Sequence, residues 1–348
     1  MKIDITLLER DIREAGHIAA RAESVGHDAA WATEAGHDPF LQAYSAIERT
    51  TSIDVGTAIA VAFARTPMTV AYSAWNLAQA SGGRFTLGLG SQIKPHIEKR
   101  YSMPWGKPVA RMREFLVALD AIWGSWRTGQ PLDHRGDYYT HRLMSPFWVP
   151  SPHEHRIPVY LAAVGPRMTE LAGERCDGIL MHAFTNREFL ESVSLPALDR
   201  GIHAGAKTVA DVEVSLPLFM IMGDTDEELA TRRQEAARQL AFYGSTPAYA
   251  PVLEAVGFGD VQPDLTQLSK RGEWDAMADL FDDELLGHFA IIGTPEQMPE
   301  LARQHVGPRV QRTSSYFGWP IDDPDRLRSI LQQFQQQQDQ PVQGDRKS

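Results

Sequence analysis

This 348-residue chain is poor in cysteine, in long apolar runs and in positive charge. Cys176 is its only cysteine, so neither an intrachain disulfide nor a four-cysteine metal site can form. No stretch approaches the roughly 18 apolar residues of a membrane span, and residues 1–16 lack the apolar core of a signal peptide. Lysine and arginine number 34 against 45 acidic residues, a formal net charge of −11. We therefore expect a cytoplasmic protein that binds neither membranes nor nucleic acid.

Short β-rich runs alternate with longer helical patterns, which is typical of a parallel sheet with crossover helices. Candidate strands lie at residues 2–7, 29–33, 54–60, 84–90, 158–164, 177–183, 212–222 and 312–319. Eight strands close a barrel, and the first strand-to-helix turn has no glycine-rich dinucleotide motif. The sequence therefore predicts an α/β fold, a (β/α)8 TIM barrel with insertion loops at its C-terminal mouth.

Local signals place two of the helices. Asp38 stands directly before Pro39, which predicts an N-cap and the start of a helix. Pro67 opens a second helical pattern, and the glycines in residues 81–83 can end it in a left-handed turn.

Two segments are too long for simple connections. Residues 128–157 are rich in proline, histidine and aromatic residues, and residues 223–287 hold one long helical pattern followed by less regular stretches. Either segment could form a lid over the C-terminal ends of the strands or pack at the periphery. We predict one domain over residues 1–330 with these two insertions, and a disordered low-complexity tail over 331–348.

Three stretches carry a family resemblance: GTAIAVAFARTP (56–67), SGGRFTLGLGSQIKPHIEKRYSMPW (81–105) and VYLAAVGPRMTELAGERCDGIL (159–180). They resemble the bacterial luciferase-like monooxygenase superfamily, and most of all its coenzyme F420-dependent oxidoreductases. The resemblance implies that coenzyme F420, a deazaflavin, binds at the barrel mouth. It implies an enzyme that transfers a hydride between the deazaflavin C5 and a small organic substrate, and a homodimer.

The resemblance also implies which residues support the ring of the cofactor. In the family the third strand bulges at a non-prolyl cis peptide bond, and the matching bond is Ala58–Ile59. Gly90 leaves room for the ring, and the side chains of Ser91 and Gln92 can donate hydrogen bonds to the cofactor. An ordinary buried strand and a tight turn without a ligand are the alternatives.

A phosphate cradle is implied at the end of the fifth strand, formed by Ala163, Val164, Gly165 and Arg167. Glycine allows close backbone approach, and a helix that starts beyond it directs free N–H groups at an anion. His182, at the end of the sixth strand, could touch the cofactor or the substrate, or be a satisfied histidine at the barrel end.

Proton transfer needs a titratable group at the mouth, and the second strand ends in WATEAGHDPF. His37 is our first candidate for a general acid or base, because histidine titrates near neutral pH. Glu34 is the second catalytic candidate, although it could instead contact the cofactor or hold the loop by hydrogen bonds.

Two further groups of residues could serve the site. A basic cluster could offset the acidic tail of coenzyme F420, or form a solvated helix face; it comprises Lys94, His96, Lys99, Arg100, Arg111 and Arg113. Trp105, Phe147 and Trp148 could line a substrate pocket or belong to the core. The later loops hold no second basic cluster, which favours a neutral or apolar substrate over a sugar phosphate.

Other functions remain open or are disfavoured. An FMN-dependent luciferase-like monooxygenase shares nearly every motif above, and a non-catalytic flavin-binding or deazaflavin-binding protein would share the cradle. We expect no metal, because the histidines at 153 and 155 lie between prolines rather than at ligand spacing on a helix. A Schiff-base lyase is disfavoured, since no predicted strand ends in lysine.

Overall fold

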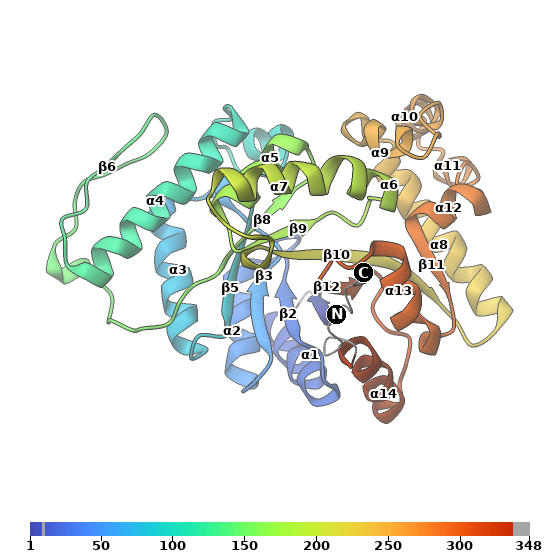
Figure 1. Ribbon diagram of the computed structural model, residues 1–348, viewed down its shortest axis with the longest axis horizontal. Coiled ribbons are helices and arrows are strands. Elements are labelled where there is room, and N and C mark those ends of the chain that lie inside the picture. Colours follow the sequence, from blue (N-terminus) through green and yellow to red (C-terminus); the bar gives the residue numbers. More distant parts are fainter. Residues whose placement is uncertain (9–10, 337–348) are drawn as a thin grey trace, which may run out of the picture.

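The computed structural model describes residues 1–8 and 11–336, and within them a closed ring of eight parallel strands (Figure 1). The ring consists of β1 (Lys2–Leu7), β2 (Ala29–Ala32), β3 (Asp54–Thr57), β5 (Phe85–Gly90), β8 (Val159–Ala163), β9 (Gly178–Met181), β10 (Glu213–Met222) and β12 (Arg312–Ser315). Pairing of β9 with β10, and of β12 with both β10 and β1, closes it. All eight predicted strands are present, and the predicted barrel is confirmed.

Two further strands lie beside this ring. β4 (Ala60–Val61) continues the path of β3 along β5. β11 (Ala290–Gly293), which the sequence analysis did not predict, pairs with the last four residues of β10.

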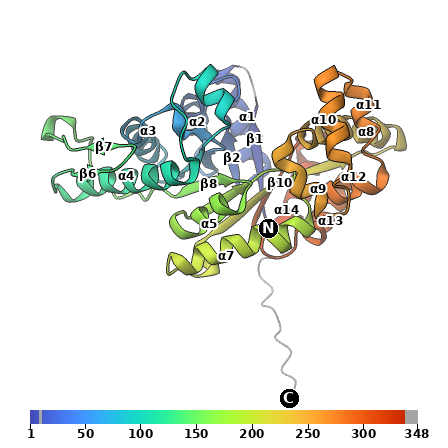
Figure 2. The ribbon, with the colours of Figure 1, turned by 90° about the horizontal axis from the view of Figure 1, so that it is seen from above.

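In the part of the chain that the structure describes, eight helices surround the ring (Figures 1 and 2). They are α1 (Ile12–Val25), α2 (Pro39–Arg49), α3 (Pro67–Ala80), α4 (Pro108–Thr128), α5 (Pro166–Arg175), α7 (Leu195–Ala204), α13 (Met298–Val306) and α14 (Pro324–Gln335). Short helical turns occur at η1 (Ala62–Ala64), η2 (His96–Arg100), α6 (Arg187–Phe189), η4 (Leu190–Ser194), η5 (Val209–Asp211) and η7 (Pro295–Gln297). No helix in the described part of the chain is long and apolar enough to cross a membrane.

The predicted helix boundaries hold for α2 and α3, but not at the C-terminus. Asp38 caps α2 by accepting hydrogen bonds from two backbone N–H groups, and Gly82 adopts a φ of 64° just beyond α3. The predicted tail starts too early, because α14 continues to Gln335 and buries Leu331 and Phe334. Residues 337–348 lie outside the described part of the chain.

The first insertion forms an arm beside α3 and α4 rather than a lid (Figures 1 and 2). It contains an antiparallel hairpin of β6 (His134–Arg135) and β7 (Thr140–His141), followed by η3 (Pro146–Trp148). The Tyr72 hydroxyl of α3 donates to the Trp148 carbonyl at 2.6 Å. Phe147 and Trp148 are 84% and 59% exposed on this arm, and their rings pack edge to face with centroids 5.0 Å apart. The prediction that these two residues line a substrate pocket is therefore wrong.

The second insertion consists of helices joined by short turns, where less regular stretches were expected after the first helical pattern. It comprises α8 (Asp226–Gly244), η6 (Pro247–Tyr249), α9 (Ala250–Glu254), α10 (Val261–Arg271), α11 (Trp274–Ala278) and α12 (Asp283–Phe289). These helices form a second hydrophobic cluster with Phe184, just after β9, and with Phe219 of β10. The insertion therefore stands over the C-terminal ends of β9 and β10.

Large side chains fill the N-terminal half of the ring. Arg312 donates to both carboxylate oxygens of Asp4, at 2.8 and 2.9 Å, and the Trp31 indole donates to the same carboxylate at 2.8 Å. The rings of Trp31 and Tyr160, from β2 and β8, meet across the interior with centroids 5.8 Å apart. Because this end of the ring is filled, a ligand must enter from the C-terminal mouth.

Candidate functional site

A bulge in the third strand shapes the interior of the mouth. β3 pairs with β5 through Gly56, and β4 resumes the pairing at Ala60, so three residues on this path face two on β5. The Thr57 hydroxyl bridges the gap, accepting from the Gly88 N–H at 2.9 Å and donating to the Gly88 carbonyl at 2.7 Å. The Ala58–Ile59 peptide bond within the bulge is cis, as the resemblance implied.

The bulge provides an apolar floor. Ala58 and Ile59 are partly buried and pack with Ala162 of β8 and Leu180 of β9. At Gly90 an added Cβ atom would lie 2.8 Å from the Ile59 side chain. Glycine is therefore needed at position 90 for Ile59 to hold its place.

Three loops of the mouth meet at Glu34. Its Oε2 accepts hydrogen bonds from the Val61 N–H at 2.7 Å and from Arg65 Nη1 at 2.6 Å. Its Oε1 accepts from the Tyr101 hydroxyl at 2.7 Å. The side chain is only 5% exposed, so Glu34 ties together the loops that follow β2, β4 and β5.

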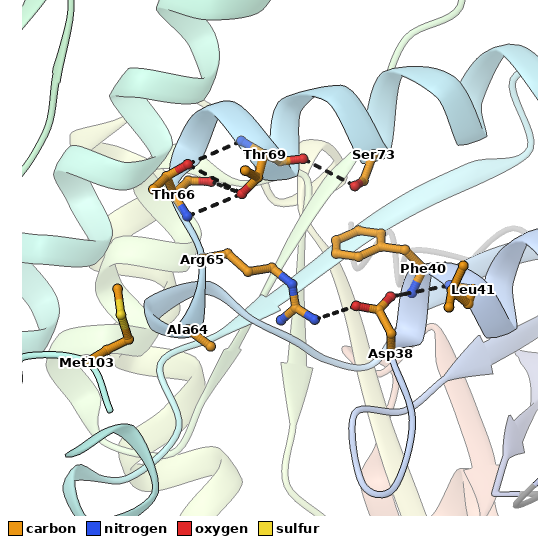
Figure 3. Close-up of a pocket in the computed structure, with 9 residues that line it drawn as sticks. All are labelled: Asp38, Phe40, Leu41, Ala64, Arg65, Thr66, Thr69, Ser73 and Met103. Carbon is orange, nitrogen blue, oxygen red and sulfur yellow. Dashed lines mark hydrogen bonds and ion pairs between the residues drawn. The ribbon is translucent and has the colours of Figure 1, made fainter. Parts of the chain in front are cut away.

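Arg65 extends this network to Asp38, with Nη2 of Arg65 2.8 Å from the Asp38 carboxylate (Figure 3). Burial lowers the pKa of the Arg65 guanidinium, but its hydrogen bonds to Glu34 and Asp38 outweigh that effect and raise it. Burial and the hydrogen bond to Glu34 raise the pKa of Tyr101 to about 12. A pocket of about 630 Å³ adjoins the network, lined by Asp38, Phe40, Leu41, Ala64, Arg65, Thr66, Thr69, Ser73 and Met103.

The predicted catalytic pair lies on one loop, but its two side chains differ in their contacts. Glu34 is fully engaged by donors, whereas Nε2 of His37 is enclosed and has no partner among the described residues. The sequence analysis missed Arg65 and Tyr101. Both lie in stretches that carry the family resemblance, but nothing in their spacing pointed to Glu34.

The predicted phosphate cradle forms the start of α5. Gly165 is the N-cap residue and offers no side-chain cap, and an added Cβ atom would meet nothing within 4 Å. It follows Ala163 and Val164 at the end of β8, and Arg167 is exposed and has no ion-pair partner among the described residues. Pro166 has no N–H and the Met168 N–H donates to the Gly165 carbonyl at 3.1 Å, so in this first turn the N–H and the guanidinium of Arg167 are the donors that suit a phosphate group.

The side chains of Ser91 and Gln92, which were predicted to donate hydrogen bonds to the cofactor, form hydrogen bonds within the loop after β5. Gln92 has a φ of 58°, and its Oε1 accepts from the Ile93 N–H at 3.0 Å. The Ser91 hydroxyl donates to the Gln92 carbonyl at 3.2 Å. The amide nitrogen of Gln92 has no partner among the described residues and remains free to donate.

Two members of the predicted basic cluster already have partners within the protein. Arg111 is buried and donates to the Pro104 carbonyl at 2.7 Å and to the Tyr139 hydroxyl at 2.8 Å. Arg113 forms an ion pair with Glu174 of α5. The prediction that these two arginines face an acidic tail is therefore wrong.

His182 lies at the mouth, directly after β9, and its Nδ1 accepts a hydrogen bond from the Phe184 N–H at 3.0 Å. Burial lowers its pKa to about 4, so the imidazole is neutral at pH 7. In residues 1–8 and 11–336, no group of three or more His, Cys, Asp or Glu side chains is arranged to hold a metal ion.

A family model described as luciferase-like monooxygenase matches residues 3–311. The chain belongs to the luciferase-like monooxygenase family. Among similar proteins, the uncharacterized protein Rv1360 of Mycobacterium tuberculosis is 48% identical over 280 residues, 80% of this chain and 82% of that protein. The putative coenzyme F420-dependent oxidoreductase Rv3520c of the same organism is 30% identical over 70% of this chain and 73% of its own length.

A solved structure supports the fold assignment. The coenzyme F420-dependent tetrahydromethanopterin reductase from Methanopyrus kandleri superposes with a TM-score of 0.74 at 19% identity, covering 95% of this chain and 96% of that one. The predicted superfamily, its oxidoreductase class and the barrel fold are thus confirmed.

Proposed function

We propose that this protein is a coenzyme F420-dependent oxidoreductase that transfers a hydride between the deazaflavin C5 and a small organic substrate. The 30% identical relative named as a putative F420-dependent oxidoreductase supports this choice of cofactor. The observation that carries the proposal is the pairing, at one mouth, of an apolar floor at Ala58–Ile59 with an uncapped helix start at Gly165. A planar ring needs the apolar floor, and a phosphate needs the uncapped helix start.

The residues fit this cofactor in chemical type. A bound deazaflavin supplies a carbon that can accept or donate a hydride, and the protein must orient it and exclude water. The residues that we propose hold it are Ala58, Ile59, Gly90, Ser91, Gln92, Ala163, Val164, Gly165 and Arg167. His182, the remaining candidate for contact with the cofactor, we assign to the substrate instead. Ala58 and Ile59 support the ring, the Gln92 amide can donate to a polar edge, and Gly165 and Arg167 face the phosphate.

Proton transfer falls to His37 in this proposal. Its Nε2 has no partner among the described residues, so no internal hydrogen bond must break for proton transfer, but the atom is enclosed and the loop must shift to bring it against a bound molecule. Glu34, the other catalytic candidate, already accepts from three donors. We therefore assign Glu34 the role of a positioning residue that holds the mouth loops around the floor.

A reaction assay separates this function from its alternatives. Purified protein with reduced coenzyme F420 should pass hydride to an acceptor without oxygen, and reduced FMN under air should give no hydroxylated product. His37→Ala should bind the cofactor normally and lose at least tenfold in turnover. Hydroxylation that depends on FMN would instead support a monooxygenase. Tight cofactor binding with no turnover on any acceptor would support a binding protein.

We also propose that the enzyme acts as a homodimer in the cytoplasm on a small-molecule substrate. Leu41 and Tyr44 of α2 are 55% and 47% exposed, which leaves apolar surface on a barrel helix for a second copy. Light scattering coupled to size-exclusion chromatography gives the oligomeric state directly. A monomeric mass at micromolar concentration would contradict the dimer.

A further inference from the structure

Four aromatic side chains gather on the side of the mouth formed by β9, β10 and β12, and we call them the aromatic wall: His182, Tyr243, Tyr249 and Tyr316. His182 follows β9 directly, and Tyr316 follows β12 directly. Tyr243 and Tyr249 come from the ends of α8 and η6, in the second insertion. The His182 ring centroid lies 4.6 Å from that of Tyr243 and 5.2 Å from that of Tyr249.

The tyrosines of the wall have hydrogen-bonding capacity to spare. The hydroxyl oxygens of Tyr243 and Tyr316 are 2.5 Å apart, so one donates to the other. A pair of hydroxyls has two protons, and this bond uses one of them, so one O–H remains available. Burial, followed by the hydrogen bond to Tyr243, raises the pKa of Tyr316, which keeps its hydroxyl protonated.

His182 also presents a donor. Because Nδ1 accepts from the Phe184 N–H, the neutral imidazole carries its proton on Nε2. This N–H has no acceptor among the described residues, and Nε2 is not one of the enclosed atoms that lack a partner. It is therefore a donor without a partner at the C-terminal end of β9, on a side chain that is only partly exposed.

The wall carries no charge, in contrast to the opposite side of the mouth. Among the described residues, no ion pair or cation–π contact involves any of its four rings. Burial alone accounts for the lowered pKa of His182, and for Tyr249 and Tyr316 the other causes are contacts with the neutral Tyr243. Across the mouth, by contrast, Glu34, Arg65 and Asp38 form an ionic network.

We propose that the aromatic wall binds a neutral, planar substrate that carries a carbonyl or hydroxyl oxygen, and that Nε2–H of His182 donates a hydrogen bond to that oxygen. Tyr243 and Tyr249 supply flat apolar surface beside the oxygen, and the free proton of the Tyr243–Tyr316 pair serves a second polar atom. A phosphorylated or carboxylated substrate finds no counter-charge on this wall. This inference rests on the proposed function and specifies the substrate class of the same site.

The test uses menadione, a neutral planar quinone, as the probe. Protein saturated with oxidised coenzyme F420 is titrated with menadione, with 2-methylnaphthalene, which has a similar ring system without oxygens, and with glucose 6-phosphate. Menadione should bind most tightly and glucose 6-phosphate should not bind. His182→Phe keeps a flat ring and removes the donor, so menadione affinity should fall about three- to tenfold while 2-methylnaphthalene affinity changes less than about twofold.

Two control variants test whether an effect of His182→Phe comes from the lost hydrogen bond or from a general disturbance of the protein. His203→Phe makes the same chemical change at an exposed site on α7 and should leave all affinities unchanged. Tyr138→Phe removes a hydroxyl from an exposed tyrosine outside the wall, so menadione affinity should change by less than about twofold.

The outcomes distinguish failure of this inference from failure of the proposed function. If coenzyme F420 binds but menadione does not, or if His182→Phe weakens both naphthalene-type probes equally, the substrate class is wrong and the proposed function stands. Tight binding of glucose 6-phosphate would also contradict the proposal that the aromatic wall binds a neutral substrate. If the protein does not bind coenzyme F420 at all, the proposed function fails and this inference falls with it.

Discussion

Nη1 of Arg65 lies 2.6 Å from Oε2 of Glu34, and the two side chains are 17% and 5% exposed. A buried ion pair of this kind is costly to break, because the remaining partner keeps its charge away from water. Arg65 also contacts Asp38, which limits the loss when Glu34 is changed. The pair joins the loop after β2 to the start of α3, next to the floor of the site.

Glu34→Gln should lower the free energy of unfolding by about 2 kcal/mol, because hydrogen bonds to a charged group contribute more than neutral ones. Urea denaturation measures the change. Glu98→Gln is the matched control, since Glu98 faces Lys94 at 3.8 Å on an exposed surface and should cost less than about 0.5 kcal/mol. Equal effects of the two substitutions would show that Glu34 does not hold the loops.

Thr57→Val should destabilise the protein by about 2 to 4 kcal/mol, because it leaves the N–H and the carbonyl of Gly88 without their buried partner. Thr57→Ser keeps the hydroxyl and should cost only about 1 kcal/mol for the lost methyl group. Chemical denaturation of both variants gives the comparison. If valine were tolerated as well as serine, the hydroxyl bridge across the bulge would not support the strand.

Gly165→Asp should separate stability from cofactor binding. Aspartate is a better N-cap than glycine by a few tenths of a kcal/mol, and position 165 has room for the side chain, so the melting temperature should stay constant or rise. The new negative charge would repel a phosphate at the start of α5, and coenzyme F420 affinity should fall at least about tenfold. Gly165→Asn, which has nearly the same shape without the charge, should lose less affinity. Unchanged affinity in the aspartate variant would place the phosphate elsewhere.

His27 makes the protein sensitive to acid. It is 6% exposed, and burial lowers its pKa to about 4 from an unfolded value near 6.5. Below pH 6.5 the unfolded chain binds a proton that the folded chain does not, so stability falls as the pH drops from 6.5 toward 4. The contribution of His27 between pH 7 and pH 5 is about 2 kcal/mol.

His27→Gln should therefore lose about 2 kcal/mol less stability than the wild-type protein between pH 7 and pH 5. Urea midpoints at the two pH values measure this difference, whatever the variant costs at pH 7. His203→Gln changes an exposed histidine and should leave the pH dependence unchanged. An identical pH dependence in His27→Gln would mean that His27 is protonated in the folded state.

The barrel could be predicted from the sequence because its strands are local features. Runs such as residues 84–90 and 212–222 are nearly continuous apolar stretches, as expected for strands covered on both faces. The helices α9, α11 and α12 were missed because each has only five to seven residues, too few for a periodic pattern, and forms by packing into the second hydrophobic cluster.

The contacts within the site could not be predicted in the same way. Glu34 meets Arg65 and Tyr101, which are 31 and 67 residues away in the sequence, and no local pattern specifies such pairs. The position of the bulge came from the family resemblance alone. Arg111 was misassigned because its charge suggested exposure, whereas the fold places it on the inner face of α4, over the Phe63 ring.

A parallel calorimetric titration of the purified protein with coenzyme F420 and with FMN tests the central claim most directly. Coenzyme F420 should bind at least about tenfold more tightly than FMN, a difference of about 1.4 kcal/mol, and Gly165→Asp should weaken the binding of coenzyme F420 at least about tenfold. Equal or tighter binding of FMN, or no binding of either molecule, would contradict this claim.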